Sequence, residues 1–161
     1  MIQSPVLPNE SERLAVMKQK GLMSVDRDDR FDEITAEAID KLHVKISVVS
    51  LITSDEEVYI SCQGEHRTCG PRNISFCGHA LAQKDVLIVR DTLKDNRYID
   101  NPYVAGPPFL RFYAGMRLTD HTTGQPLGVF CVKDDQPRDF NIEELGIFVS
   151  LANKAELILQ K

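Results

Sequence analysis

Cys77 and His79 are the residues of this chain whose types are best suited to covalent chemistry. A thiolate close to an imidazole can act as a nucleophile or as a redox centre. Ser75 is placed to cap a short helix that would carry both residues. On a helix, two side chains separated by one residue point roughly 200° apart and face away from each other. We therefore expect no catalytic dyad: Cys77 should pack under the roof of the sheet, and His79 should line or cap a cavity.

A zinc site is a second chemistry to consider, because cysteine and histidine are zinc ligands. The spacing of the available residues, Cys-x3-His-x2-Cys-x7-Cys-x-His, matches no closed structural zinc pattern. Cys62 is also expected to lie on a strand, which does not suit a compact set of ligands in a loop. We therefore expect no metal and no other cofactor. The residues concerned are Cys62, His66, Cys69, Cys77 and His79.

Arg111 and Tyr113 could bind an anion, because they share one face of a predicted strand whose opposite face is uniformly apolar. A planar guanidinium beside a phenol suits a carboxylate or another polar anion. The alternative is a buried ion pair between Arg111 and an acidic residue of the preceding loop, since a buried arginine rarely lacks a partner. Anion binding and the ion pair are compatible if a ligand competes for Arg111 and thereby releases the loop. The acidic candidates are Asp91, Asp95 and Asp100.

The elements that position these residues follow from the periodicity of apolar side chains. Alternating or continuous apolar runs predict strands, and apolar residues every three to four positions predict helices. Helices at both ends and hairpins between them are typical of an α+β domain with a central antiparallel sheet of five to six strands, helices on one face and a loop-roofed cavity on the other. Helices are predicted over residues 8–21, 28–42, 75–83 and from 141 onward, and strands over 46–53, 58–63, 86–90, 110–118 and 127–133.

Residues 91–109 form a long stretch without any period. Loops of this length in compact domains are usually functional or disordered. Tyr98 and Tyr103 make this stretch too apolar for disorder. We therefore expect an ordered lid over the cavity, with Asp100 and Asn101 on it.

Composition excludes several classes of function. The 161 residues suffice for a single domain, residues 1–161, with a core over about residues 12–159. The net charge is −5 and no run of Lys and Arg is present, so nucleic-acid binding is not expected. No apolar run approaches the roughly 20 residues of a membrane span, and no signal segment is visible. We expect a cytoplasmic protein without a membrane partner, whose four cysteines are free thiols.

Six motifs follow one another along the chain: Arg72-Asn-Ile-Ser-Phe-Cys-Gly-His-Ala80, Val89-Arg-Asp91, Asp95-Asn-Arg97, Asn101-Pro102, Arg111-Phe-Tyr-Ala-Gly115 and Leu127-Gly-Val-Phe-Cys-Val-Lys-Asp-Asp135. In this order they resemble a GAF sensory domain, of the subgroup found N-terminal in bacterial diguanylate cyclases and histidine kinases. The resemblance implies a small-molecule sensor in signal transduction that forms a homodimer through its terminal helices. It also implies a downstream output module such as a cyclase or kinase. The expected ligand-binding residues are Phe76, Cys77, His79, Arg111 and Tyr113, with Asp100 and Asn101 on the lid.

Other activities within the same family fit the sequence less well. In bilin photoreceptors a histidine directly follows the chromophore-binding cysteine, whereas here Gly78 separates Cys77 from His79. The Asn-Lys…Phe…Asp-Glu signature of cyclic-nucleotide-binding members is not found. Free methionine sulfoxide reductases use cysteines around the pocket, and Cys69 with Cys77 could form such a pair. A third family cysteine would be expected in residues 91–109, which contain none. We therefore expect a binding domain and keep the reductase as the alternative.

Overall fold

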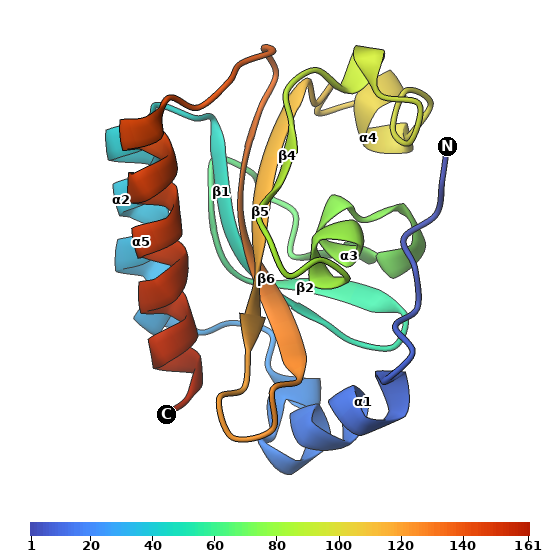
Figure 1. Cartoon of the computed structure of the whole chain (residues 1–161), viewed down its shortest axis with the longest axis vertical. Helices are drawn as coiled ribbons and strands as arrows, with labels where there is room; N and C mark the ends of the chain where they lie inside the picture. Colours follow the sequence, from blue (N-terminus) through green and yellow to red (C-terminus); the bar gives the residue numbers. More distant parts are fainter.

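A six-stranded antiparallel sheet forms the centre of the protein in the computed structural model, which describes residues 1–161 (Figure 1). Its strands are β1 (Ile46–Ile52), β2 (Glu56–Gln63), β3 (Cys69–Pro71), β4 (Leu87–Val89), β5 (Phe112–Thr119) and β6 (Pro126–Asp134). Their order across the sheet is β3-β2-β1-β6-β5-β4. Every residue of β1 is buried, as expected for a central strand covered on both faces. The predicted α+β domain with a central antiparallel sheet is confirmed.

Two long helices cover one face of the sheet. They are α2 (Asp32–Leu42) and α5 (Ile142–Leu159), and they run side by side (Figure 1). Ile34, Ala38 and Leu42 recur at helical spacing along α2 and are buried. The predicted capping box is present at the start of α5, where Asn141 and Glu144 bond to each other's backbone. No helix of the structure combines the length and apolar character that a membrane crossing requires.

These helices and the facing side chains of the sheet bury a cluster of 20 residues. Phe130 of β6 and Phe148 of α5 stack within it, with ring centroids 5.2 Å apart. Each fully buried Leu, Ile or Phe side chain stabilises the fold by about 1.5–3 kcal/mol. The cluster therefore holds both helices firmly on the sheet.

The opposite face is covered by short helices and loops. Here α3 (Phe76–Leu81) packs against β5 and β6, and α4 (Pro102–Ala105) lies within the lid (residues 91–109). The remaining helix, α1 (Glu10–Gln19), lies at one end of the sheet (Figure 1). Ser75 caps α3 as predicted, because its Oγ accepts a hydrogen bond from the backbone N–H of Gly78 at 3.1 Å.

Several short elements are absent from the sequence-based prediction. The three residues of β3, Cys69-Gly-Pro71, pair with β2 at the edge of the sheet. Glycine and proline hide a strand pattern, and proline is tolerated on edge strands. Four 3₁₀ turns complete the chain: η1 (Leu22–Ser24), η2 (Asp29–Phe31), η3 (Arg72–Ile74) and η4 (Thr92–Lys94).

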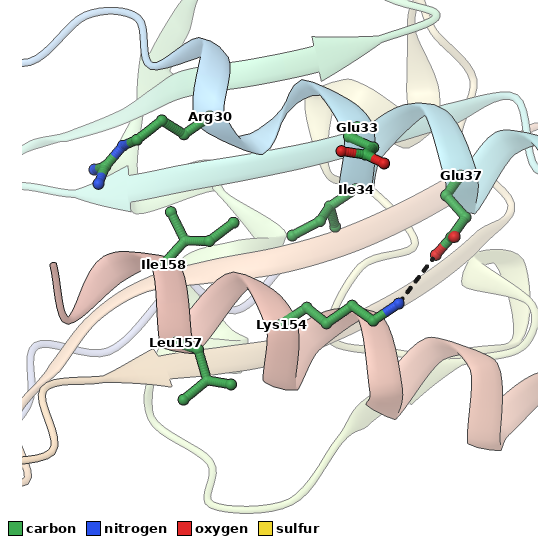
Figure 2. Close-up of a pocket in the computed structure, with 7 residues that line it drawn as sticks. All are labelled: Arg30, Glu33, Ile34, Glu37, Lys154, Leu157 and Ile158. Carbon is green, nitrogen blue, oxygen red and sulfur yellow. Dashed lines mark ion pairs between the residues drawn. The ribbon is translucent and has the colours of Figure 1, made fainter.

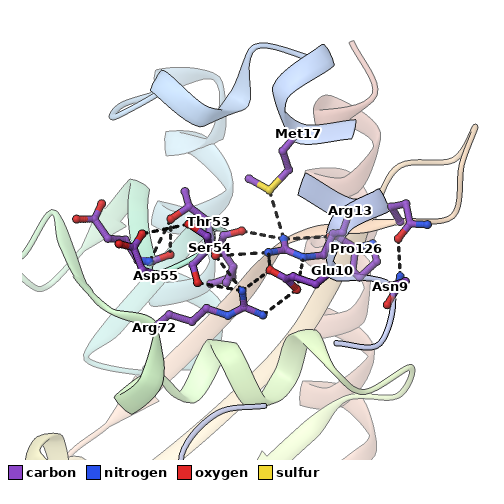
Figure 3. Close-up of polar contacts among 12 residues, drawn as sticks. Asn9, Glu10, Arg13, Met17, Thr53, Ser54, Asp55, Arg72 and Pro126 are labelled. Carbon is purple, nitrogen blue, oxygen red and sulfur yellow. Dashed lines mark hydrogen bonds and ion pairs between the residues drawn. The ribbon is translucent and has the colours of Figure 1, made fainter. Parts of the chain in front are cut away.

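A network of two buried arginines and one glutamate joins α1 to the rest of the fold (Figure 3). Arg13 donates from Nη1 to the carbonyl oxygen of Ile52 at 2.8 Å. Arg72 donates from Nη1 to the carbonyl oxygen of Thr53 at 3.0 Å. Glu10 lies between them and accepts from Nη2 of Arg13 at 2.8 Å and from Nη2 of Arg72 at 3.1 Å. The network thus connects α1, the end of β1 and the segment that precedes α3.

This network predicts an acid-sensitive contribution to stability. Burial alone would raise the pKa of Glu10, but hydrogen bonds from Arg72 and Arg13 lower it to about 2 from an ordinary value of 4.5. The stabilisation by ionised Glu10 is therefore complete above about pH 4.5 and lost as the pH falls towards 2. Urea unfolding of the wild type and of Glu10→Gln at a series of pH values should give stability curves that converge over this interval. Parallel curves would contradict the assignment.

Candidate functional site

The sheet face beneath α3 is the place where the sequence predicts a ligand cavity. The structure fills this space with a cluster of 17 buried residues. Phe76 of α3 stacks on Tyr98 of the lid, with ring centroids 4.4 Å and planes 13° apart, and its centroid lies 5.2 Å from that of Tyr113. His79 meets Tyr98 edge-on at 5.1 Å. The expectation of a loop-roofed cavity is therefore corrected, because aromatic side chains from helix, lid and strand fill this space.

Tyr113 lies along its own strand because the next position on that face is a glycine. A Cβ atom at Gly115 would lie 2.6 Å from Cζ and 2.7 Å from Cε1 of the Tyr113 ring. The phenol donates a hydrogen bond to Sγ of Cys77 at 3.1 Å. Burial raises the pKa of Cys77 and of Tyr113 well above their ordinary values. Both groups are therefore protonated at neutral pH, and Cys77 is not a thiolate nucleophile.

Lys133 of β6 extends into the same region and is only 4% exposed. Its Nζ donates to the phenol oxygen of Tyr59 at 3.0 Å and lies 5.0 Å from the centre of that ring. Burial raises the pKa of Tyr59, so its phenol is a neutral partner. An ammonium group has three N–H donors, and only the one to Tyr59 finds an acceptor in the protein. Lys133 is therefore a buried cation with unused hydrogen-bonding capacity.

Glu57 of β2 lies on the same face, two residues before Tyr59, and is 3% exposed. Its Oε1 accepts a hydrogen bond from Oγ of Ser75 at 2.6 Å, so the cap of α3 is tied to the sheet. Its Oε2 is buried without a partner, and so is the hydroxyl of Tyr98. Buried polar atoms are nearly always hydrogen-bonded in folded proteins. Glu57, Lys133 and Tyr98 therefore offer free polar contacts in one buried region.

Strand alternation explains how these groups reach one face. Along β6, Val129 and Cys131 point towards α3, whereas Phe130 and Val132 point towards the long helices, so Lys133 also faces α3. A lysine at the end of such an apolar strand is a signal in the sequence that its environment is special. The prediction nevertheless omits Lys133. Glu57, Tyr59 and Tyr98 are omitted as well, since charged and aromatic residues near turns are common.

The lid is held by polar contacts where its two ends meet and near its middle. Thr92 donates from Oγ1 to the carbonyl oxygen of Leu110 at 2.7 Å. Asn101 donates from Nδ2 to the carbonyl oxygen of Ile74 at 2.9 Å, and its Oδ1 caps α4 by accepting from the N–H of Tyr103 at 2.9 Å. Asn101 is 1% exposed. The predicted lid residue Asn101 is thus an anchor that ties the lid to the segment before α3.

Arg111 and Asp100 lie away from the buried polar groups. Arg111 is half-buried and donates from Nη1 to the carbonyl oxygens of Val104 at 3.1 Å and Leu110 at 2.9 Å. It forms none of the expected ion pairs, because its acidic candidates are used elsewhere: Asp95 pairs with Arg97 and exposed Asp100 with the amino group of Met1, while Asp91 caps η4. Arg111 therefore braces the lid through backbone carbonyl groups.

An N-terminal segment, here called the strap (residues 1–7), crosses the lid and α3. The N–H of Ile2 donates to the carbonyl oxygen of Arg97 in the lid at 3.1 Å. The carbonyl oxygen of Ile2 lies 3.1 Å from Nε2 of His79, whose pKa is lowered by burial, so the neutral ring donates. Ser4 bonds to the segment before α3. The strap thus fastens the lid to α3.

Deleting residues 1–4 is expected to accelerate thiol labelling of Cys77 about tenfold or more, because each lost hydrogen bond that holds the lid contributes about 1 kcal/mol. Cys77 is fully buried, so a reagent reaches it only when the region above it opens. Pulse labelling followed by mass spectrometry of the Cys77 peptide measures this rate. Exposed Cys69 is the internal control and should react equally fast in both proteins. An unchanged rate at Cys77 would show that the strap does not hold the lid.

Cys69 and Cys77 are not brought together as the reductase alternative would require. Cys69 is exposed on the edge strand β3 and pairs there with Val58. Cys77 is buried in α3 and bonded to Tyr113. Neither cysteine is part of a disulfide.

The opposite face of the molecule carries a hollow of about 330 Å³ between α2 and α5, here called the helix groove. Its apolar part is formed by Ile34, Leu157 and Ile158, and Leu157 is 57% exposed. Charged residues border it, and Lys154 forms an ion pair with Glu37 across the groove at 3.7 Å (Figure 2). The helix groove is thus an apolar strip with a charged rim on the surface of the two long helices.

Comparisons with known proteins agree with this architecture. The sequence model of the GAF domain matches residues 26–159. A cyclic di-GMP phosphodiesterase of Pseudomonas aeruginosa is 36% identical over 138 residues, which are 86% of this chain and 23% of that protein. The chain therefore spans about a quarter of the length of this curated relative.

Solved structures show the same fold at low sequence identity. The GAF domain of an Acinetobacter phosphoenolpyruvate-protein phosphotransferase has a TM-score of 0.64 and 16% identity, with 92% of this chain and 90% of that chain covered. A free methionine-R-sulfoxide reductase of Neisseria meningitidis, in complex with its substrate, has a TM-score of 0.64 and 18% identity, with 98% and 93% covered. Similarity at this level of identity concerns the fold alone.

Proposed function

This chain belongs to the GAF domain family, and from that premise we propose that it is a small-molecule-binding regulatory domain of a signalling protein. The ligand would bind on the sheet face beneath α3, against Glu57, Tyr59, Phe76 and Lys133. The lid and the strap would cover it. The observation that carries the proposal is the unused hydrogen-bonding capacity of Lys133 and Glu57, since a buried charge without a full set of partners is costly.

Binding in this filled region requires side chains to move aside. Tyr98 is the candidate, because it belongs to the lid and its buried hydroxyl has no partner. Moving Tyr98 off Phe76 would open space within the aromatic cluster beneath α3. The aromatic cluster would then line the ligand with apolar surface, as is usual in small-molecule sites.

A ligand in this position has a direct way to affect the rest of the fold. If it takes Glu57 away from Ser75, the cap of α3 loses a partner. Caps of this kind contribute about 1 kcal/mol each. The segment before α3 also carries Arg72, which bonds to Glu10 of α1, so a shift there would reach the N-terminal helix. If an output module adjoins this domain, α1 and α5 would transmit the change to it.

The output module is proposed by analogy with the curated relative, which is named a cyclic di-GMP phosphodiesterase. Of the output modules expected from the sequence, one that acts on cyclic di-GMP agrees with this relative better than a kinase does. The same proposal places the domain in the cytoplasm, where its four free cysteines would stay reduced.

A thermal-shift screen of a metabolite library tests the binding function. A ligand present at 100 times its Kd should stabilise the wild type by about 2.7 kcal/mol, which corresponds to a rise in Tm of about 5–10 °C. Lys133→Met should weaken this response to about half, whereas Lys84→Met, a change of an exposed lysine, should keep it in full. If no compound stabilises the wild type, or if Lys133→Met responds as the wild type does, the proposed binding function is wrong.

We also propose that the domain forms a homodimer through the helix groove. An isologous contact would place Leu157 and Ile158 of each copy against the other copy, and the charged rim would fix the register. In such an interface each substitution occurs twice. The exposed apolar side chains of Ile142 and Leu157 on α5 support this choice of surface.

Leu157→Glu is expected to weaken dimerisation at least about tenfold, because it places two buried carboxylates in the interface. Sedimentation equilibrium measures the dissociation constant. Leu93→Glu, at a position with 48% exposure in η4 away from the helix groove, is the matched control and should not alter it. Equal dissociation constants for both variants would place the dimer contact elsewhere.

Reduction of free methionine sulfoxide is a second candidate, because a reductase from Neisseria meningitidis shares the fold. The buried, protonated thiol of Cys77 and its separation from exposed Cys69 argue against it. We expect no turnover of free methionine sulfoxide in the presence of a thiol reductant. Turnover that disappears in Cys77→Ser would replace the binding proposal with the enzymatic one.

A further inference from the structure

The two charged groups beneath α3 do not compensate each other by direct contact. Lys133 bonds only to Tyr59, and Glu57 bonds only to Ser75. Both are at least nine-tenths buried and face the same layer of aromatic side chains. One cation and one anion with unused hydrogen-bonding capacity therefore share this region.

The neighbouring charges of the chain form one further pair, although Oε2 of Glu65 is itself buried without a hydrogen-bond partner. Arg67 pairs with Glu65 at 3.5 Å, and its guanidinium lies 4.1 Å from the centre of the Tyr103 ring. Tyr59 is neutral and cannot balance the charge of Lys133. No further side chain of the protein completes the hydrogen bonding of Lys133 or of Oε2 of Glu57.

The sign of these charges restricts the chemistry of a ligand. A purely anionic molecule could satisfy Lys133 but would place its charge near Glu57, and a purely cationic molecule has the reverse problem. A neutral molecule would leave both charges incompletely paired. A molecule with one group of each sign satisfies both residues at once, and its apolar part can pack against Phe76 and Tyr113.

We propose, on the basis of the proposed binding function, that the ligand is a small zwitterion of the free α-amino acid class, with its carboxylate on Lys133 and its ammonium group on Glu57. Lys133 and Glu57 are then the residues that determine specificity.

Matched sets of compounds test this class directly. L-leucine, 4-methylpentanoate and 3-methylbutylamine share a carbon skeleton and differ only in charged groups, and the same triplet can be built for other amino acids. Thermal shift and calorimetry should identify at least one amino acid that binds about 10- to 100-fold more tightly than either counterpart. An acid, amine or neutral compound that binds the wild type more tightly than every amino acid would overturn the zwitterion class and leave the binding function standing.

Two variants assign the charges to residues. In Glu57→Gln the preference for the amino acid over its carboxylate counterpart should fall about tenfold, and in Lys133→Met the preference over the amine counterpart should fall similarly. Each preference is a ratio measured within one variant, so a change in protein stability cancels. Ratios unchanged from the wild type would overturn the assignment. Failure of every compound, charged or neutral, to bind the wild type would instead overturn the proposed binding function.

Discussion

Glu10→Gln should destabilise the protein by about 3 kcal/mol and lower Tm by about 6–12 °C. The substitution keeps the shape of the side chain and removes its charge. Arg13 and Arg72 are almost fully buried, so their positive charges would face each other without a carboxylate between them. Removal of one partner from a buried ion pair costs about 3–5 kcal/mol, and the 16% exposure of the Glu10 side chain places the expected value at the lower end.

Urea unfolding at neutral pH measures this loss. Glu12→Gln is the matched control, because Glu12 lies in the same first turn of α1 and is exposed. It should change the stability by less than about 0.5 kcal/mol. Similar losses for both variants would mean that the effect comes from charge at the start of the helix and not from the two arginines.

Gly115→Ala should destabilise the protein by about 2 kcal/mol, although alanine normally suits a strand better than glycine does. The added methyl group would overlap the ring of Tyr113, which is confined by Phe76 and Cys77. The ring must leave its position, and the buried region beneath α3 would lose its packing. Chemical denaturation measures the change.

A double substitution identifies the cause. Gly115→Ala combined with Tyr113→Leu should be more stable than the sum of the two single effects predicts, because the shorter side chain leaves room for the methyl group. Tyr113→Phe keeps the ring and loses only the hydrogen bond to Cys77, so it should cost less than about 1 kcal/mol. Strict additivity in the double variant would contradict the described packing of Tyr113 on Gly115.

The framework of the fold could be predicted because each element has a strong local signal. Alternation correctly places Phe112 towards the long helices and Tyr113 towards α3, but the strand begins at Phe112, and Leu110, predicted on the face of Phe112, lies beneath α3 instead. The capping residues Ser75 and Asn141 lie where their helices begin. These signals depend only on residues that are close in the sequence, so they can be recognised without knowledge of the tertiary structure.

The candidate site could be predicted only in part, because its geometry depends on contacts between distant segments. Phe76, Cys77 and Tyr113 lie together as expected. Arg111 does not join them, since it is used by carbonyl groups of the lid. The polar groups that remain unpaired, above all Lys133, become recognisable only when the partners of every buried side chain are known. The role of the strap could not be predicted for the same reason, because Ile2 and His79 are far apart in the sequence.

Hydrogen–deuterium exchange with and without the best ligand from the screen is the most direct test of the central claim that a small molecule binds beneath α3. The amides of residues 76–81 and 95–105 should exchange about tenfold or more slowly when the ligand is bound, because its presence holds α3 and the lid in place. Exchange in α2 and α5 should change less. Protection confined to the helix groove, with residues 76–81 and 95–105 unaffected, would contradict the claim.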